Sequence, residues 1–154
     1  MKITTHSFSS LDLTQLYDIL QLRAAVFVVE QDCVYQDIDG KDQNALHIIG
    51  TQDNKIVAYT RVFKPGDYLD KAAIGRVVVH PDYRKQHLGK TIMMASIQAI
   101  QDHFNPPTPS SGQRLPIGLS AQTYLLDFYK ELGFVAVGDA YLEDGIPHIY
   151  MERS

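Results

Sequence analysis

The feature that most constrains the fold is an apolar run followed by a long amphipathic pattern. Residues 72–80 are strand-like and almost continuously apolar after Arg76, which is typical of a central strand covered on both faces. Pro81 and Asp82 end this run. Apolar residues then recur at three- and four-residue spacing from Leu88 to Phe104, which predicts a long helix. A buried strand that leads into a long helix favours an α/β fold.

The rest of the chain predicts further helices and strands around this central pair. We expect a first helix over residues 9–27, begun by a capping box of Ser9 and Asp12. Its predicted apolar stripe is Leu13, Leu16, Tyr17, Leu20, Ala24 and Phe27. The remaining expectations are a hairpin of strands 46–51 and 56–63, a Pro/Ser-rich loop at 105–116, a strand at 117–121, a helix at 124–132, and strands at 134–143 and 147–152. Together they predict a mixed, largely antiparallel central sheet flanked by helices.

Length and composition narrow the class of protein. A chain of 154 residues has the size of one domain, so a single domain over residues 1–154 is expected. The formal net charge of −4 argues against a nucleic-acid partner. The sequence has no apolar run of the ~20 residues that a membrane span needs and no secretory signal, which predicts a cytoplasmic protein. Cys33, the single cysteine, is expected to be a small buried residue. The oligomeric state stays open, a homodimer included.

The turn between the central strand and the long helix has the features of an anion site. The first N–H groups of a helix lack intrahelical partners, and the helix dipole places positive charge there. Arg84, Lys85 and Lys90 add full charges, and no acidic residue occurs between Arg84 and Gln101. These features suit a pyrophosphate, although a solvated basic helix start has the same pattern. The glycine and GK[ST] patterns of dinucleotide and Walker loops are absent from the sequence.

Two motifs in this region resemble the GNAT superfamily of N-acetyltransferases. The cofactor motif Q/R-x-x-G-x-G/A corresponds to residues 84–89, with His87 in place of the usual first glycine. Residues 128–134, Phe-Tyr-Lys-Glu-Leu-Gly-Phe, are similar to the FYxxLGF element of these enzymes. Residues 22–31, 37–42, 74–77 and 144–149 look like the ElaA-type branch of the family.

The resemblance implies a GNAT-like fold and acetyl-CoA as acyl donor. It implies that the backbone of the central strand receives the pantetheine arm and that the helix start receives the pyrophosphate. We expect ordinary helix-start geometry at His87, which any residue can adopt. The cofactor-binding residues implied are Val77, Val78, Val79, Arg84, Lys85, Gln86, His87, Leu88, Gly89, Lys90 and Gln122.

Acyl transfer to an amine needs an acid for the departing thiolate and a base for the amine, most of which is protonated at neutral pH. By resemblance, Tyr129 is the general acid and His148 the general base. A core aromatic and a structural histidine are the alternatives for these two residues. His47 and Glu30 are reserve bases, and His80 is expected to cap the turn that follows it.

The acceptor is a primary amine of a small molecule or peptide that the sequence does not identify further. Glu30 and Arg76 are candidate acceptor-binding residues, and Arg76 and Arg23 could instead form ordinary salt bridges. The acidic loop 30–42 is expected to be solvated, although it could attract an amine. It lacks the spacing of a calcium loop, and no metal site is expected. A non-catalytic CoA-binding sensor and a plain interaction domain remain as alternative functions.

Overall fold

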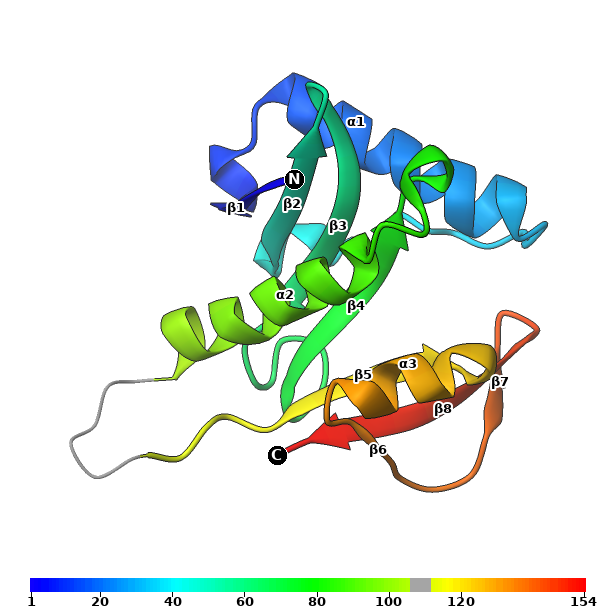
Figure 1. The fold of residues 1–154 in the computed structure, drawn as a ribbon. Helices are drawn as coiled ribbons and strands as arrows, with labels where there is room; N and C mark the ends of the chain where they lie inside the picture. Colours follow the sequence, from blue (N-terminus) through cyan, green and yellow to red (C-terminus); the bar gives the residue numbers. More distant parts are fainter. Residues whose placement is uncertain (106–111) are drawn as a thin grey trace.

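The computed structural model describes residues 1–105 and 112–154 (Figure 1). Their strands form one eight-stranded sheet in the order β1-β2-β3-β4-β5-β8-β6, with β7 paired to β8. Only β4 and β5 pair in parallel. The elements are β1 (Lys2–Ser7), α1 (Leu13–Arg23), β2 (Leu46–Gln52), β3 (Lys55–Phe63), β4 (Ala72–Val79), α2 (Leu88–Phe104), β5 (Ile117–Gln122), α3 (Leu126–Glu131), β6 (Val135–Ala136), β7 (Tyr141–Glu143) and β8 (Ile146–Arg153). The predicted mixed, largely antiparallel sheet flanked by helices is therefore confirmed.

Helices α1 and α2 cover opposite faces of the sheet. Successive residues of a strand point to opposite faces, so two neighbours on β2 contact the two different helix layers. Ile48 belongs to the cluster under α2, whereas its neighbour Ile49 belongs to the cluster under α1. Both residues are at most 2% exposed. The central part of the sheet is thus buried on both sides, as the apolar run at 72–80 predicts.

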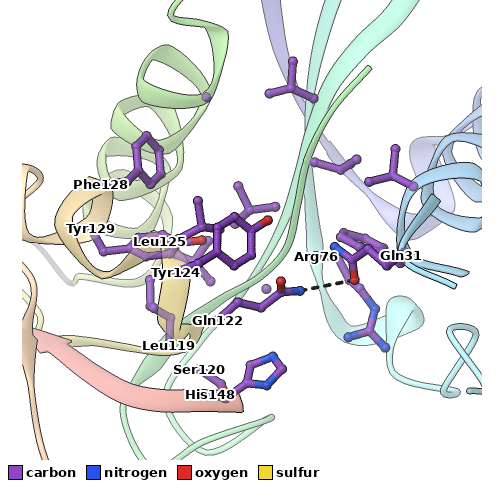
Figure 2. A pocket seen from close by; sticks show the side chains of 18 of the residues that line it. Gln31, Arg76, Leu119, Ser120, Gln122, Tyr124, Leu125, Phe128, Tyr129 and His148 are labelled. Carbon is purple, nitrogen blue, oxygen red and sulfur yellow. Dashed lines mark hydrogen bonds between the residues drawn. The ribbon is translucent and has the colours of Figure 1, made fainter. Parts of the chain in front are cut away.

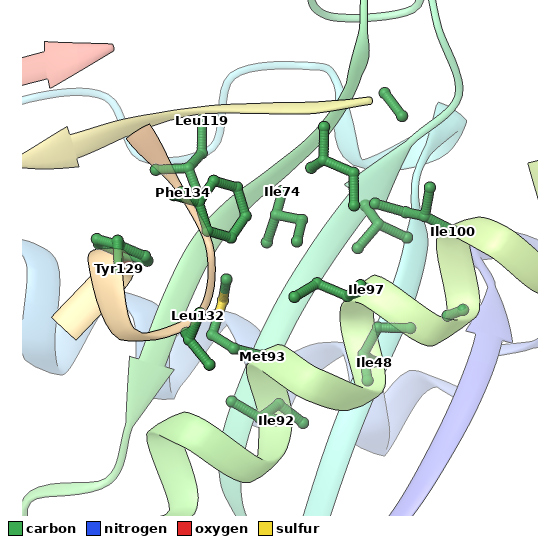
Figure 3. Packing of buried hydrophobic residues seen from close by; sticks show 14 of the residues in the cluster. Ile48, Ile74, Ile92, Met93, Ile97, Ile100, Leu119, Tyr129, Leu132 and Phe134 are labelled. Atoms are coloured by element: carbon green, nitrogen blue, oxygen red, sulfur yellow. The ribbon is translucent and has the colours of Figure 1, made fainter. Parts of the chain in front are cut away.

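The larger core joins the two halves of the sheet (Figure 3). Ile92, Met93 and Ile97 of α2 face the sheet at helical spacing. Leu132 and Phe134, which follow α3, pack into the same cluster. Helix α3 and helix α2 therefore share one core, and this fixes α3 beside the strands that carry the candidate site.

The structure corrects the prediction for the first helix. Helix α1 begins at Leu13, and its capping box is formed by Asp12 and Gln15, whose side chains and backbone N–H groups bond reciprocally. Leu13 is 86% and Tyr17 71% exposed, so the predicted stripe is wrong at these residues. The buried face contains Ile19, Leu22, Arg23 and Val26 instead. A pattern that treats every arginine as exposed misses this face.

Other differences lie near the ends of the chain. Strand β1 pairs antiparallel with β2 and was not predicted, because its residues KITTHS carry no apolar alternation. The single predicted strand at 134–143 is divided into β6 and β7. The predicted hairpin of β2 and β3 and the long helix α2 are confirmed. Most of the predicted loop at 105–116 lies outside the described residues.

The acidic loop is not solvated as expected, because its aspartates enter a buried ion network. Arg23 Nη1 and Arg61 Nη1 lie 2.7 and 2.9 Å from the same oxygen of Asp42. Arg23 Nε lies 2.9 Å from Asp37 Oδ2, and Arg61 Nη2 lies 2.6 Å from Asp39 Oδ2. Both arginines are 0% exposed. The loop's carboxylates therefore balance buried guanidinium charges, which is why Arg23 occupies the buried face of α1.

Two titrating groups show the effect of this network. Burial alone would raise the pKa of Asp42, but hydrogen bonds from Arg23 and Arg61 outweigh burial and lower it. Burial lowers the pKa of His47, which keeps the ring neutral. His47 Nε2 donates to the carbonyl oxygen of Asp42, and Nδ1 accepts from the hydroxyl of Tyr59. With both ring nitrogens engaged in the core, His47 has no free nitrogen to act as a base.

Among the described residues, none of the helices is long and apolar enough to cross a membrane.

Candidate active site

A cavity opens where β4 and β5 separate. The two strands pair only at Ala72–Ile117 and Ala73–Gly118, so beyond Ala73 the edge of β4 that faces β5 has no ladder partner. The space between the strands has a volume of about 690 Å³. The other walls come from α2, α3, the β7–β8 turn and the segment after α1. Figure 2 shows the cavity from close by. The cavity therefore has free backbone groups along one wall, as an extended amide-containing ligand requires.

The wall formed by β4 is distorted by a β-bulge. The register between β3 and β4 shifts between Tyr59 and Arg61, which pair with Val78 and Gly75. Arg76, inside the bulge, has a φ of 51°, a conformation that non-glycine residues adopt rarely. Its side chain lies 2.7 Å from Asp37 Oδ1 and 3.4 Å from Asp39 Oδ2. The ion network thus holds this strained residue in place, and Arg76 is not a free cation.

The start of α2 forms the basic end of the cavity. His87 is the N-cap of the helix, but its φ of 60° and ψ of 21° are left-handed, so the expectation of ordinary helix-start geometry at His87 is wrong. Lys85 also has a positive φ, of 66°. Alternating conformations of this kind direct successive N–H groups toward one point and create an anion-binding concavity. The position that is usually glycine in the family motif therefore keeps the backbone geometry of a glycine.

We expect His87→Gly to stabilise the protein. Glycine adopts the left-handed region without the steric cost of a side chain, and part of this gain is offset by the greater entropy of glycine in the unfolded chain. The expected rise in unfolding free energy is about 0.5–1 kcal/mol. Urea unfolding followed by circular dichroism measures it. Gln86→Gly is the matched control and should lower stability, because Gln86 has no positive φ. A loss of stability in His87→Gly would contradict the strain argument.

The predicted cofactor-binding residues divide into four groups. Lys85 and Lys90 line the cavity and form no ion pair with any described residue. Arg84 also lines it, but its two terminal nitrogens lie 2.6 and 3.1 Å from the carboxylate of Glu30. Gln86 does not line the cavity, because its side chain is directed to Gln52, 3.5 Å away. The other predicted residues, Val77, Val78, Val79, His87, Leu88, Gly89 and Gln122, all line it.

Gly89 lies at a point where α2 approaches α3 and β4. A Cβ atom at Gly89 would meet Phe128 at 3.6 Å and Val79 at 3.8 Å, which are ordinary contact distances. Alanine is therefore tolerated at this position, in agreement with a motif that accepts glycine or alanine.

Tyr129 extends from α3 into the cavity (Figure 2). Its ring packs between Phe128 and Phe134, and the residue is 5% exposed. Burial raises the pKa of Tyr129 well above its ordinary value of 10.0, so the phenol stays protonated at neutral pH. Among the described residues, none forms a hydrogen bond with its hydroxyl. The group is therefore available to a ligand in the cavity.

His148 on β8 faces the other end of the cavity and is 7% exposed. Its Nδ1 donates to the carbonyl oxygen of Ile146 at 2.7 Å, which leaves the lone pair of the neutral ring on Nε2. Nε2 lies 3.3 Å from a carboxylate oxygen of Glu143. Tyr141 stacks on the ring at a centroid distance of 6.3 Å. Contacts with Ile146, Glu143 and Tyr141 hold the ring in one orientation, and its Nε2 lies beside a carboxylate.

The cavity contains further polar residues that the sequence analysis did not identify. Tyr124, Ser120 and Glu143 line it, and so do Gln31 and Tyr35. Gln122 Nε2 donates to Gln31 Oε1 at 3.3 Å and links the end of β5 to the segment after α1 (Figure 2). Cys33, which is buried as expected, donates to the carbonyl oxygen of Asp144. These contacts join segments far apart in the sequence, so no local pattern indicates them. His80 lies outside the cavity and accepts from the N–H of Asp82, which confirms its capping role.

Comparisons with known proteins agree with this geometry. The family model of the acetyltransferase (GNAT) domain matches residues 14–154. Protein ElaA of Escherichia coli K12 is 44% identical over 147 residues, which cover 94% of this chain and 91% of that protein. The crystal structure of Escherichia coli ElaA superposes with a TM-score of 0.87 at 40% identity, with both chains fully covered.

An acyl-CoA N-acyltransferase from Pseudomonas aeruginosa is also similar, with a TM-score of 0.88, 38% identity and full coverage of both chains. More distant, at 18% identity and a TM-score of 0.69, is the CoA-dependent acyl-homoserine lactone synthase BjaI, which shares the fold. The family match extends from α1 to the end of β8 and includes every wall of the cavity. This chain therefore belongs to the GNAT family of acyl-CoA-dependent acyltransferases, in its ElaA-like branch.

Proposed function

We propose that this protein transfers the acetyl group of acetyl-CoA to a primary amine, with Tyr129 as general acid and His148 as general base. The observation that supports it most is the order of groups along one cavity. The start of α2, with its free N–H groups and lysines, lines one part of the cavity, and the β7–β8 pair, with His148, lines another. In Figure 2 the side chains of Tyr129 and Tyr124 lie between Phe128, which is close to Gly89 at the start of α2, and His148.

The residues present fit a coenzyme A molecule. The first N–H groups of α2, the left-handed backbone at Lys85 and His87, and the side chains of Lys85 and Lys90 suit a pyrophosphate. The unpaired edge of β4 offers donors and acceptors to the amides of pantetheine. The coenzyme supplies an activated acyl group as a thioester, and the protein's own residues bind it, orient it and move protons.

The proposed roles follow from the hydrogen bonds of each side chain. His148 accepts a proton from the acceptor's ammonium group at Nε2, because Nδ1 is already committed to Ile146. Tyr129 donates its phenolic proton toward the departing sulfur, because its pKa keeps it protonated. The cavity holds the amine nitrogen and the thioester carbon close together, so the attack becomes effectively unimolecular.

Two measurements test this function. Calorimetric titration with CoA is expected to give saturable binding, and release of free thiol from acetyl-CoA is expected to depend on an added primary amine. CoA binding without thiol release for any amine would favour the alternative of a CoA-binding sensor. Absence of CoA binding at millimolar concentration would exclude both functions and leave an interaction domain.

We expect His148→Ala to remove the ionisation that limits kcat on the acid side of the pH–rate profile. A general base contributes roughly 10²–10⁴-fold, so turnover at neutral pH should fall within this range. His103→Ala is the control, because His103 is exposed on α2 and does not line the cavity. An acid limb that persists unchanged in His148→Ala would assign the base to another residue.

A further inference from the structure

The charges that line the cavity are separated along its length. Lys85 and Lys90 at the start of α2 are the cations without an ionic partner among the described residues. Arg84 and Arg76 also line the cavity but are paired with Glu30 and with the aspartates of the acidic loop. The β7–β8 end carries the carboxylates of Glu143 and Asp144. The cations of the cavity without an ionic partner therefore lie at the start of α2, whereas the β7–β8 part, which contains His148, contributes carboxylates and no lysine or arginine.

Glu143 is the carboxylate of this end that contacts the catalytic candidate. Its Oε2 lies 3.3 Å from His148 Nε2, and its Oε1 accepts from Ser120 Oγ at 3.4 Å. Ser120 Oγ also bonds to the hydroxyl of Tyr141. Across the described residues, Glu143 has no lysine or arginine partner, and its side chain is 47% exposed. Its charge is thus held in place but not neutralised.

The arginines of the cavity do not offer a comparable site for an anion. Arg76 is bound to Asp37 and Asp39, and Arg84 is bound to Glu30. An acceptor carboxylate near His148 would meet the carboxylate of Glu143 with no free guanidinium to compensate it. Like charges in a partly desolvated cavity repel strongly. The acceptor end therefore selects by charge.

We propose that Glu143 binds the ammonium group of the acceptor beside His148, and that the acceptors are alkylammonium compounds that carry no carboxylate. This inference rests on the proposed acetyl transfer and names its acceptor class. Glu143 is not among the site residues predicted from the sequence. The groups that contact His148 are Glu143 and Tyr141 from β7, the carbonyl of Ile146, and the uncharged Gln122 opposite it on β5.

The step balances as follows. The acceptor ammonium gives one proton to His148 Nε2, and the imidazolium formed is paired with Glu143. The amine nitrogen then forms a bond to the thioester carbon, and the carbon–sulfur bond breaks. Tyr129 protonates the sulfur and regains a proton derived from the amide nitrogen. One ammonium and one thioester thus yield one amide, one thiol and one released proton.

A series of three acceptors with the same four-carbon chain tests the charge selection. Butylamine, 1,4-diaminobutane and 4-aminobutyrate end in a neutral, a cationic and an anionic group. We expect kcat/KM, measured by thiol release, to be highest for 1,4-diaminobutane and at least tenfold lower for 4-aminobutyrate than for butylamine. Equal values, a preference for 4-aminobutyrate, or no turnover of any of the three by a CoA-binding protein would overturn the proposal. Absence of CoA binding would instead refute the proposed function itself.

The variant Glu143→Gln tests the residue. Loss of a hydrogen bond between charged groups is expected to lower kcat/KM for 1,4-diaminobutane roughly 10- to 100-fold, mainly through KM. Discrimination against 4-aminobutyrate should disappear, and Glu143→Asp should restore part of it. Glu152→Gln is the control, because Glu152 pairs with Lys71 outside the cavity. A purely structural role would leave the discrimination between butylamine and 4-aminobutyrate unchanged in Glu143→Gln.

Discussion

Replacement of Tyr129 by Phe is expected to lower kcat by roughly 10²–10⁴-fold, the range for loss of a positioned proton donor. The affinity for CoA should stay within a few-fold of the native value. The ring of Tyr129 contributes to the core through Phe128 and Phe134, and Phe retains these contacts. Only the hydroxyl is removed, and no described residue depends on it. The loss should therefore fall on the chemical step, which steady-state kinetics and calorimetry with CoA separate.

Two further variants make this prediction specific. Tyr150→Phe on β8 should leave kcat essentially unchanged, because Tyr150 does not line the cavity. Tyr124→Phe tests the neighbouring phenol, because Tyr124 lines the cavity and is 74% exposed. If Tyr124→Phe slows turnover strongly and Tyr129→Phe does not, the acid is Tyr124. The acid limb assigned to His148 should persist in Tyr129→Phe.

Replacement of Asp42 by Asn is expected to lower the unfolding free energy by about 3–5 kcal/mol, the cost of removing one partner from a buried ion network. Asp42 accepts from both Arg23 and Arg61, and both arginines are fully buried. Asparagine fills the same volume but leaves the two guanidinium charges without a shared counter-charge. Urea unfolding followed by far-ultraviolet circular dichroism measures the loss. Asp67→Asn, on the surface, should change stability by less than about 0.5 kcal/mol.

The same network gives the direction of the acid sensitivity. Hydrogen bonds from arginines lower the pKa of Asp39 and Asp42 below their ordinary value of 3.8, against the opposing effect of burial. The unfolded chain therefore binds more protons than the native chain in this range, so stability is lost as the pH falls below about 4. Asp42→Asn has one titrating carboxylate fewer, so its free energy of unfolding should fall less steeply between about pH 4 and pH 2. An equally steep loss would show that Asp42 does not contribute.

Local signals in the chain were sufficient for the elements that form the proposed phosphate site. The apolar run of β4, the Pro81–Asp82 turn and the basic start of α2 are contiguous, so composition and spacing predict them together. The motif at residues 128–134 similarly predicts α3 and its tyrosine. The sequence alone also indicated the family that the comparisons show.

Sequence patterns do not predict the burial or backbone conformation of a residue where contacts between distant parts of the chain determine it. Arg23 is buried because Asp37 and Asp42, fourteen and nineteen residues later, return to it. Leu13 is exposed because it lies on the side of α1 opposite Leu22, the buried residue nine positions later. His87 carries no sequence mark of its left-handed backbone. These outcomes depend on charges and surfaces that meet only in the folded chain.

The sequence by itself determined the class of fold and the order of most elements, because these follow from backbone preference and apolar spacing over short distances. Three features appear only in the tertiary structure. Strands β4 and β5 diverge, the aspartates of the acidic loop form ion pairs with buried arginines, and Glu143 lies beside His148. Each of these results brings together groups from different elements. The free energy of each contact depends on how deeply its groups are buried and on which opposite charge lies nearest. Neither quantity can be read from the order of residues along the chain.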